Sequence, residues 1–248
     1  MVPAIFAPWS VVHLASVPLH EGDRVLDVAC GTGILVRRAA AIVGPRARLV
    51  ALDINFEMIQ AGRAAADGMP IEWWHGDALS LPFAPASFDV VLSQQGLQFL
   101  PDPLRALREM HRVLAVGGQV AVSVWGRIED SPGHLALSSA VARHVGPEPA
   151  AFAGFSLSDP GRLYGLISDA GFRNVKIASR EIIAHFASVQ EFVGIVAAGA
   201  ASLRGVLDRV PNGARMAFVQ QVEADLQPWT SIDGLAFPMR GHIAVASV

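Results

Sequence analysis

Residues 25–33 read Val-Leu-Asp-Val-Ala-Cys-Gly-Thr-Gly, an apolar run that breaks into a Gly-x-Gly turn, and residues 33–43 continue with helical spacing. This order predicts a buried strand, a tight turn and a helix. The two glycines let the backbone turn sharply and approach a ligand closely, and the free N–H groups of the helix start can point at a negative group. The stretch therefore predicts a nucleotide-binding turn.

An acidic residue, Asp53, ends the next apolar run, Ala47–Leu52. About twenty residues separate it from Gly33, the distance that a strand-helix-strand unit requires. A carboxylate at the end of a buried strand, with no obvious basic neighbour, is costly unless a partner satisfies it. Ribose hydroxyls are such partners, so Asp53 is predicted to bind a ribose.

The composition bounds the class of protein. The chain has 248 residues, 52% of them hydrophobic and 17% charged, which indicates a soluble enzyme with one elaborated domain. No apolar run reaches the roughly 18 residues of a membrane span. The longest, Phe192–Leu203, contains Gly194 and Gly199 and is better explained as a buried helix or a pocket wall.

Charge and cysteine content narrow the choice further. The net charge of −3 gives no reason to expect a nucleic-acid partner. The single cysteine, Cys30, excludes an intramolecular disulfide and fits a reducing cytoplasm. The N-terminus carries no signal-peptide pattern, so we expect a cytoplasmic protein.

Short apolar runs alternate with helical spacing from Arg24 to Trp125, which predicts a mostly parallel sheet with helices on both faces. Asp102 and Asp159, each followed by proline, are predicted to cap helices. The expected strands are 24–29, 47–53, 70–75, 87–93, 118–125, 174–185 and a terminal strand, 241–248, beside the sixth. The expected helices of this core are 33–43, 55–67, 103–115 and 159–171.

Two segments interrupt this alternation. Residues 126–157 are rich in Gly, Pro and Ala, with one helix expected at 133–145, and residues 188–229 are predicted to form two or three helices with a break at 211–213. Ligands bind at the carboxyl edge of open α/β sheets, where we expect both insertions to lie. The sequence thus predicts a doubly wound, seven-stranded α/β fold: one domain over 1–248, a cofactor-binding core over 20–125, and two substrate-covering insertions.

The nucleotide is not expected to be a dinucleotide. Gly-x-Gly-x-x-Gly requires a third glycine beside the pyrophosphate, and Val36 stands there instead. A second acidic site follows the third strand, in Gly76–Phe83. Asp77 can accept a hydrogen bond from an adenine amino group, and Ala78 and Leu79 leave an apolar slot for the ring.

With these motifs the chain resembles the class I S-adenosylmethionine-dependent methyltransferases, within the branch that includes the quinone-biosynthesis methyltransferases. The resemblance covers nearly the whole chain and implies their Rossmann-like fold and S-adenosylmethionine as cofactor. Five segments carry it in order, which is far more specific than one glycine turn: Val25–Gly33, Ala51–Asn55, Gly76–Phe83, Ser87–Ser93 and Arg112–Gly118.

The resemblance also implies roles for individual residues. Asp53 would hold the ribose, Ile54 and Met58 would pack near the adenine, and Asp77 and Ala78 would contact its edge. The backbone at Gln94 would approach the amino acid end. The turn around the methionine part would consist of Ala29, Cys30, Gly31, Thr32 and Gly33.

The chain departs from that family pattern in two places. Ala29 stands where many members have glycine. The helix that usually precedes Pro3 and helps to close the site is not seen ahead of Ile5, so part of the lid is expected to be missing or supplied otherwise.

Several residues keep two interpretations. Asp27 either orders the glycine turn or contacts the ligand. Gln94, Gln95 and Gln98 either face the ligand crevice or cap the loop, whereas Cys30 is expected to be a small buried residue rather than a nucleophile. The histidines form no ligand-spaced cluster, so no metal site is expected.

Tryptophans are the remaining aromatic candidates. Trp73 and Trp74 are expected in the core rather than as a stacking platform. Trp9, Trp125 and Trp229 either wall an apolar pocket or merely pack.

The predicted reaction is methyl transfer from S-adenosylmethionine to a small, apolar acceptor such as a ring, quinone-like or acyl compound. Positioning supplies much of such an acceleration, and no catalytic base stands out in the sequence. The alternatives are a nicotinamide-dependent oxidoreductase and a catalytically inactive S-adenosylmethionine-binding module. The methylated atom and the oligomeric state stay open, a homodimer included.

Overall fold

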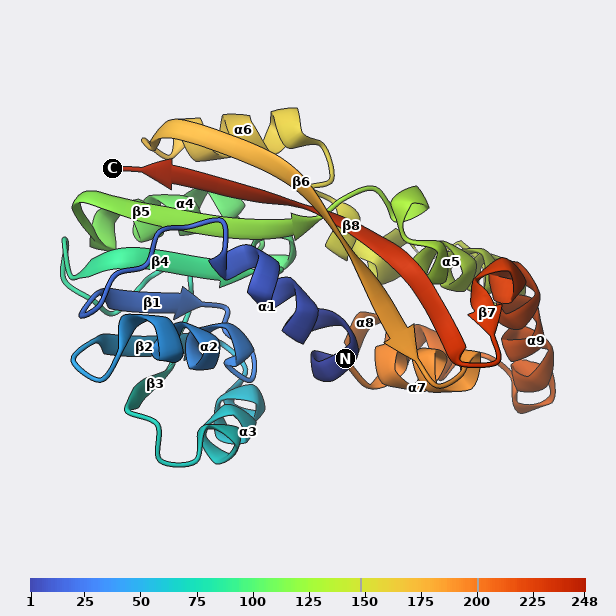
Figure 1. Cartoon of the computed structure of the whole chain (residues 1–248). Coiled ribbons are helices and arrows are strands. Elements are labelled where there is room, and N and C mark those ends of the chain that lie inside the picture. Colours follow the sequence, from blue (N-terminus) through green and yellow to red (C-terminus); the bar gives the residue numbers. More distant parts are fainter. Residues whose placement is uncertain (148, 200) are drawn as a thin grey trace.

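The computed structural model describes residues 1–147, 149–199 and 201–248. Its sheet has the order β3-β2-β1-β4-β5-β8-β6, and the two-residue β7 pairs with β8 outside this path (Figure 1). The strands β1 to β5 are parallel, and β8 runs antiparallel between β5 and β6. The bounds are β1 Arg24–Val28, β2 Arg48–Asp53, β3 Ile71–His75, β4 Phe88–Gln94, β5 Leu114–Trp125, β6 Arg173–Phe186, β7 Thr230–Ser231 and β8 Gly234–Ser247.

The expected mostly parallel sheet is therefore confirmed, as is the return of the terminal strand beside the sixth. Two boundaries differ. The helix expected at 103–115 ends at Val113, because Leu114 pairs with Phe88 and already belongs to β5. The terminal strand begins at Gly234 rather than at 241, because its first half pairs with the outer half of β6.

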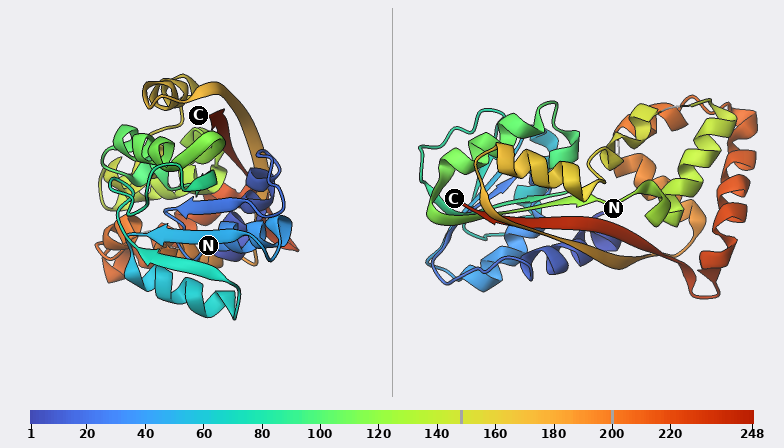
Figure 2. Two further views of the ribbon diagram at one scale, coloured as in Figure 1. Left: turned by 90° about the vertical axis from the view of Figure 1, so that its left-hand side faces the viewer. Right: turned by 90° about the horizontal axis from the view of Figure 1, so that it is seen from above.

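Helices cover both faces of the sheet (Figure 2). The asparagine and aspartates that precede three of them accept backbone hydrogen bonds as N-caps: Asn55 from Met58, Asp102 from Arg105 and Asp159 from Gly161. The helices are α1 Ala7–Leu14, α2 Ile34–Val43, α3 Phe56–Ala66, α4 Pro103–Val113, α5 Pro132–His144, α6 Pro160–Asp169, α7 Val189–Gly199, α8 Ala201–Leu207 and α9 Arg215–Leu226. Shorter turns are η1 Val2–Phe6, η2 Leu97–Phe99, η3 Ile128–Asp130, η4 Pro149–Phe155, η5 Asn212–Ala214 and η6 Gln227–Trp229.

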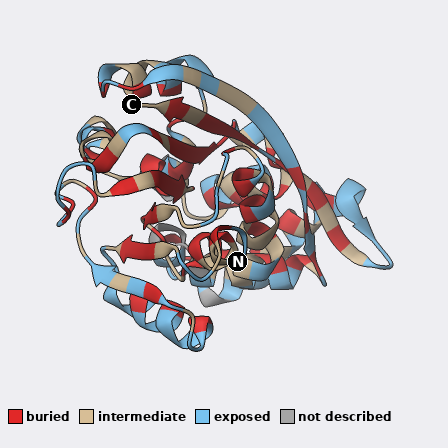
Figure 3. Cartoon of the chain, turned by 60° about the vertical axis from the view of Figure 1, so that its left-hand side comes forward, coloured by how far each residue is buried: buried red, intermediate tan, exposed pale blue. Residues whose placement is uncertain are grey.

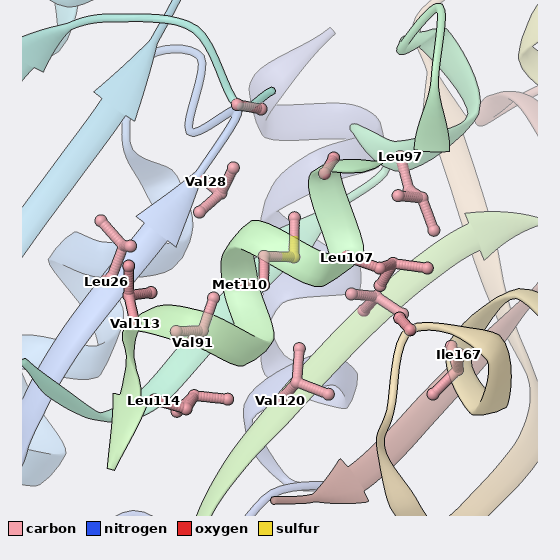
Figure 4. Packing of buried hydrophobic residues seen from close by; sticks show 14 of the residues in the cluster. Leu26, Val28, Val91, Leu97, Leu107, Met110, Val113, Leu114, Val120 and Ile167 are labelled. Carbon is pink, nitrogen blue, oxygen red and sulfur yellow. The ribbon is translucent and has the colours of Figure 1, made fainter. Parts of the chain in front are cut away.

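Two apolar cores fill the sheet half, which we define as β1 to β5 with α1 to α4 and α6. One lies between the sheet and α4 and α6, where Leu107, Met110 and Ile167 face Val91 and Val120 (Figure 4). The other lies on the opposite face, under α2 and α3. Buried side chains thus alternate along each central strand between the two faces, and the outer surfaces of the helices stay exposed (Figure 3).

A third core lies mainly in a helical lobe, which we define as 126–157, 188–229 and the strand ends 181–186 and 234–240, apart from the two undescribed residues. It also includes Ile5, Trp9, Trp125 and Ile243, outside the lobe. The lobe extends beyond the carboxyl ends of the parallel strands (Figure 1). Its centre is aromatic: the Phe192 ring lies 5.0 Å from Phe186 and 5.2 Å from Phe237, centroid to centroid. In the part of the chain that the structure describes, no helix combines the length and apolar character needed to cross a membrane.

Candidate functional site

The glycine turn leaves β1 in the left-handed region, with φ of 55° at Ala29, 55° at Gly31 and 72° at Gly33. Gly33 has no room for a side chain, because a Cβ there would lie 2.3 Å from the Trp73 ring. Trp73 packs against this turn and against α3, as expected of a core residue, while Trp74 keeps 38% of its surface exposed and contacts the Phe83 ring. The turn is thus fixed by sterics from β3.

Asp53 joins the turn to the end of β2. Its Oδ2 accepts from the Gly31 backbone N–H at 2.8 Å, and its Oδ1 accepts from the Asn55 N–H at 2.8 Å. Two backbone donors therefore already satisfy this carboxylate, so its burial requires no ligand, and ribose binding by Asp53 stays a prediction. Each oxygen retains a further lone pair, so the arrangement orients Asp53 without using up its accepting capacity.

Asp27 orders the glycine turn, one of the two interpretations that the sequence left open, and contact with a ligand stays a prediction. Its Oδ2 accepts from the Val36 N–H at 3.2 Å, which orders the start of α2, whereas Oδ1 is buried without a partner among the described residues. Burial raises the pKa of Asp27 to about 8, the Val36 hydrogen bond opposes this, and the Asp53 charge adds to it. An unsatisfied buried carboxyl oxygen is costly, and a cationic or donating ligand group would satisfy it.

Cys30 is inert in this setting. Only 8% of its surface is exposed, and burial, together with the charges of Asp27 and Asp53, raises the pKa of the thiol well above its usual value. The thiolate, which is the nucleophilic form, is therefore disfavoured. This agrees with the expectation of a small packing residue.

The residues predicted to surround an adenine lie together at the carboxyl ends of β2 and β3. Ile54 and Met58 are 67% and 36% exposed, and Asp77 is exposed while its Oδ1 accepts from the Leu79 N–H at 2.9 Å. Ala78 is buried beneath them. Two bonds tie the strand ends together: Gly76 N–H to the Asp53 carbonyl, and His75 Nε2 to the Ile54 carbonyl, at 3.0 and 2.9 Å.

The loop after β4 meets the turn after β1 at close range. A Cβ at Gly96 would lie 2.7 Å from the Ala29 Cβ and 3.0 Å from the Ser93 Oγ, so the glycine at 96 makes room for the alanine at 29. Gln95 lies in the left-handed region, with φ of 53°, and its N–H donates to the Ser123 carbonyl at 2.9 Å. The two ligand-facing loops are therefore packed as one unit.

Buried polar atoms without a partner gather along this edge. Gln94 Nε2 donates to the Phe6 carbonyl at 3.0 Å, but its Oε1 is unpaired. Gln98 Nε2 contacts Gln95 Oε1 at 3.4 Å. The unpaired atoms among the described residues are Trp9 Nε1, Asp27 Oδ1, Ser93 Oγ, Gln94 Oε1, Gln95 Nε2 and Gln98 Oε1.

Aromatic rings stand beside these amides. The Trp125 ring, at the end of β5, lies 5.7 Å from Trp9 and 6.2 Å from Phe6. Trp9 and Trp125 thus lie together at the sheet edge, as expected. Trp229 ends η6, which lies against α9, and 39% of its surface is exposed.

Two histidines that no sequence pattern marks are the buried His13 and the half-buried His134. His13 on α1 contacts Ser123 Oγ at 3.0 Å and the Ala121 carbonyl at 3.2 Å, and burial lowers its pKa to about 4. His134, in the first turn of α5, contacts Ser131 Oγ through Nδ1 at 2.9 Å, and burial again lowers its pKa to about 4. No sequence spacing marks either residue, because their partners are distant in the chain or lie in a Pro-Gly helix start.

Within the described residues no group of three or more His, Cys, Asp or Glu side chains could hold a metal ion. The polar groups at the carboxyl edge are instead acceptors and amides that suit an organic ligand. Every cofactor residue predicted from the sequence lies at this edge, on the turn after β1, the ends of β2 and β3, the first turn of α3 or the end of β4.

Comparisons of the sequence with known proteins identify related methyltransferases. Residues 26–122 match the family model described as a methyltransferase domain. A 2-phytyl-1,4-naphtoquinone methyltransferase of Thermosynechococcus vestitus is 40% identical over 115 residues, which span 46% of this chain and about half (51%) of that protein. A demethylmenaquinone methyltransferase of Listeria welshimeri is 33% identical over 187 residues, 69% of this chain and 79% of that one.

Solved structures share the fold. A phosphoethanolamine N-methyltransferase 2 of Haemonchus contortus, bound to S-adenosylhomocysteine, superposes with a TM-score of 0.61 over 97% of this chain and 52% of that one, at 18% identity. At that identity the likeness concerns the fold. The extended sequence match and the ordered motifs along β1 to β5 place the chain in the family of class I S-adenosylmethionine-dependent methyltransferases.

Proposed function

We propose that this chain methylates an apolar hydroxylated ring of the hydroquinone type at the carboxyl edge of its sheet. The observation that carries the proposal is the set of buried, unpaired polar atoms between Asp27 and Gln98. One of these residues, Gln94, donates to the carbonyl of Phe6, whose ring contacts Trp125. A site of this composition suits a ligand that has an apolar body and a few polar atoms.

The residues present fit S-adenosylmethionine as the donor. The turn over 29–33 brings the backbone close to a ligand, and the unpaired Asp27 Oδ1 suits the ammonium of the methionine part. Asp53 and Asp77 keep free lone pairs for a ribose and an adenine amino group. The donor supplies an electrophilic methyl, so the chain's own part is to align the acceptor and exclude water.

The acceptor class rests on the lobe and on the relatives. The relatives named above act on naphthoquinone-type compounds, and the lobe offers an aromatic interior next to the sheet edge. We assign to 126–157 and 188–229 the role of covering that acceptor, within a single domain. Cys30 as the sole cysteine fits a reducing compartment, and we propose the cytoplasm.

The test uses the purified chain, tritium-labelled S-adenosylmethionine and 2-geranyl-1,4-naphthohydroquinone kept reduced under nitrogen. We expect label in the organic phase and a product heavier by one methylene group in mass spectrometry. Phosphoethanolamine, a polar acceptor, serves as the control and is expected to stay unlabelled. Calorimetric binding of S-adenosylhomocysteine without any labelled product would support an inactive binding module instead.

A further inference from the structure

His134 lies in the lobe, in the first turn of α5. Its ring centroid is 5.4 Å from the Phe155 ring of η4 and 5.9 Å from the Phe192 ring of α7. Gly133 beside it allows this packing, because a Cβ there would lie 2.2 Å from the Phe237 ring. The imidazole is thus walled by aromatic rings, and burial is the sole cause of its lowered pKa.

One nitrogen of His134 is committed and the other is free. Nδ1 lies 2.9 Å from the Oγ of Ser131, a residue that is itself buried. Nε2 has no hydrogen-bond partner within the described ranges, although the residue keeps part of its surface accessible. In the tautomer whose Nδ1–H donates to Ser131, Nε2 is an acceptor aimed away from that contact.

An apolar pocket of about 310 Å³ lies along α5, beginning four residues beyond His134, which is not among its lining residues. The Phe155 ring lines this pocket and also contacts the His134 ring. Ser138 and Val141 line the pocket too, and they lie four and seven residues after His134, on the same face of α5. Its lining residues are Ile128, Ser138, Val141, Ala142, Pro147, Phe152 and Phe155. This volume lies at the lower end of the range for small-molecule sites. A polar hollow of about 240 Å³ beside Asp23 and Asp89 lies at the opposite, amino edge of the sheet.

The segment η4 connects this pocket to the sheet edge. A Cβ at Gly154 would lie 2.9 Å from the Phe99 ring and 3.7 Å from the Trp125 ring. Ser156 Oγ donates to the Gln98 carbonyl at 3.3 Å. Phe155 lies between Gly154 and Ser156 in the sequence, and its ring contacts His134. The histidine therefore packs against the same segment that touches the loop after β4.

We propose that the pocket between α5 and η4 holds the apolar part of the methyl acceptor and that His134 Nε2 accepts the proton of its ring hydroxyl. The proposal rests on the proposed function, because it takes a hydroxylated ring as the acceptor. The O–H bond breaks with its electron pair left on oxygen, and the proton moves to Nε2. The oxygen or a conjugated ring carbon then bonds to the methyl carbon, while the carbon–sulfur bond breaks onto sulfur.

Two effects act on this step in opposite directions. The surroundings lower the pKa of His134 to about 4, which leaves Nε2 unprotonated at pH 7 but makes it a weaker base than a free imidazole. Protonating it places a positive charge there, while the transfer removes the positive charge of the sulfonium. The site therefore carries the same net charge before and after, which limits the cost of forming the imidazolium away from water. Ser131 acts as a positioning residue that fixes the tautomer.

The first experiment compares His134→Gln with His144→Gln, a matched change on the same helix. His144 packs against Phe218, away from the pocket. With 2-geranyl-1,4-naphthohydroquinone as the acceptor, we expect His134→Gln to lower kcat by about 10² or more and His144→Gln to leave it unchanged. Both should bind S-adenosylhomocysteine as the wild type does. Ser131→Ala should lower kcat by a smaller factor, with KM unchanged.

The second experiment needs no turnover. It measures quenching of tryptophan fluorescence by the oxidised probe, 2-geranyl-1,4-naphthoquinone, with S-adenosylhomocysteine present. Ser138→Phe fills the pocket and is expected to raise the Kd at least tenfold. Ser139→Phe places the same ring on the exposed neighbouring position and is expected to leave the Kd unchanged.

The outcomes separate the two proposals. A kcat of His134→Gln within threefold of the wild type overturns the role of His134 and leaves the proposed function standing. Equal Kd values for Ser138→Phe and Ser139→Phe, or no binding by the wild type, overturn the pocket. Binding that depends on Ser138 but gives no turnover in the wild type removes both the proposed reaction and the proton transfer, and supports the pocket alone.

Discussion

At the ligand edge of the sheet half, backbone hydrogen bonds hold the structure: Gly31 and Asn55 donate to Asp53, and Val36 donates to Asp27. In the lobe, ring contacts among Phe186, Phe192 and Phe237 form the centre instead. Hydrogen bonds fix positions to fractions of an ångström, whereas apolar packing accepts many side chains of similar volume. This difference accords with the roles proposed above, in which the sheet half would position the methyl donor and the lobe would select the acceptor.

The largest expected effect comes from emptying the lobe's centre. Phe192→Ala should destabilise the protein by about 3–5 kcal/mol, because the fully buried ring leaves a cavity among its neighbours. Below the unfolding transition, the affinity for S-adenosylhomocysteine should stay within about twofold, since that ring touches no residue of the glycine turn. Thermal unfolding and calorimetry measure the two quantities. A parallel loss of cofactor affinity would show that the two regions are not independent.

Gly33→Ala tests the sheet half in the same way. The added Cβ meets the Trp73 ring and holds an unfavourable φ, so we expect a loss of about 3 kcal/mol in the free energy of unfolding. Gly31→Ala is the matched control, because its Cβ would meet nothing within 4 Å at a similar φ. It should lose only about 1–2 kcal/mol. Equal losses in urea unfolding would contradict the role assigned to Trp73.

Asp53→Ala should weaken S-adenosylhomocysteine binding by about 1.5–3 kcal/mol through lost hydrogen bonds to a charged group. The structure adds a second effect, since the backbone donors of Gly31 and Asn55 lose their acceptor. Asp53→Asn keeps one side-chain oxygen and should lose less in both affinity and stability. Unchanged affinity in Asp53→Ala by calorimetry would refute the ribose assignment.

The smallest expected effect concerns pH at the junction of α1 and β5. The folded-state pKa of His13, about 4, lies below the ordinary histidine pKa of 6.5. The unfolded chain therefore binds the proton more readily, and stability is lost as pH falls from about 6.5 towards 4. Between pH 7 and 5 this group should cost about 2 kcal/mol. His13→Gln should show a shallower loss in urea unfolding at the two pH values, and an identical slope would exclude His13 as a source.

The same comparison explains what the sequence could predict. The strands and turns of the sheet half follow from apolar runs, glycines and capping aspartates, which act locally, and the predicted cofactor residues all lie at one edge. The backbone donors that satisfy Asp53 could not be predicted, because they come within reach of its carboxylate only once β1 and β2 pair. The role proposed for His134 could not be predicted, because its surroundings are formed by Phe155 and Phe192 from other elements. The position of Trp229 depends on the packing of η6 against α9, which the sequence does not show.

The pairing of β6 with β8 also affects how fast the lobe can move. In the sheet, residues 241–247 of β8 pair with both β5 and β6, but residues 235–240 pair only with β6, apart from the contact of Leu235 with β7. A ribbon of two strands twists more readily than a wide sheet. We expect twisting of residues 181–186 against 235–240 to be a slow motion of the lobe relative to the sheet half.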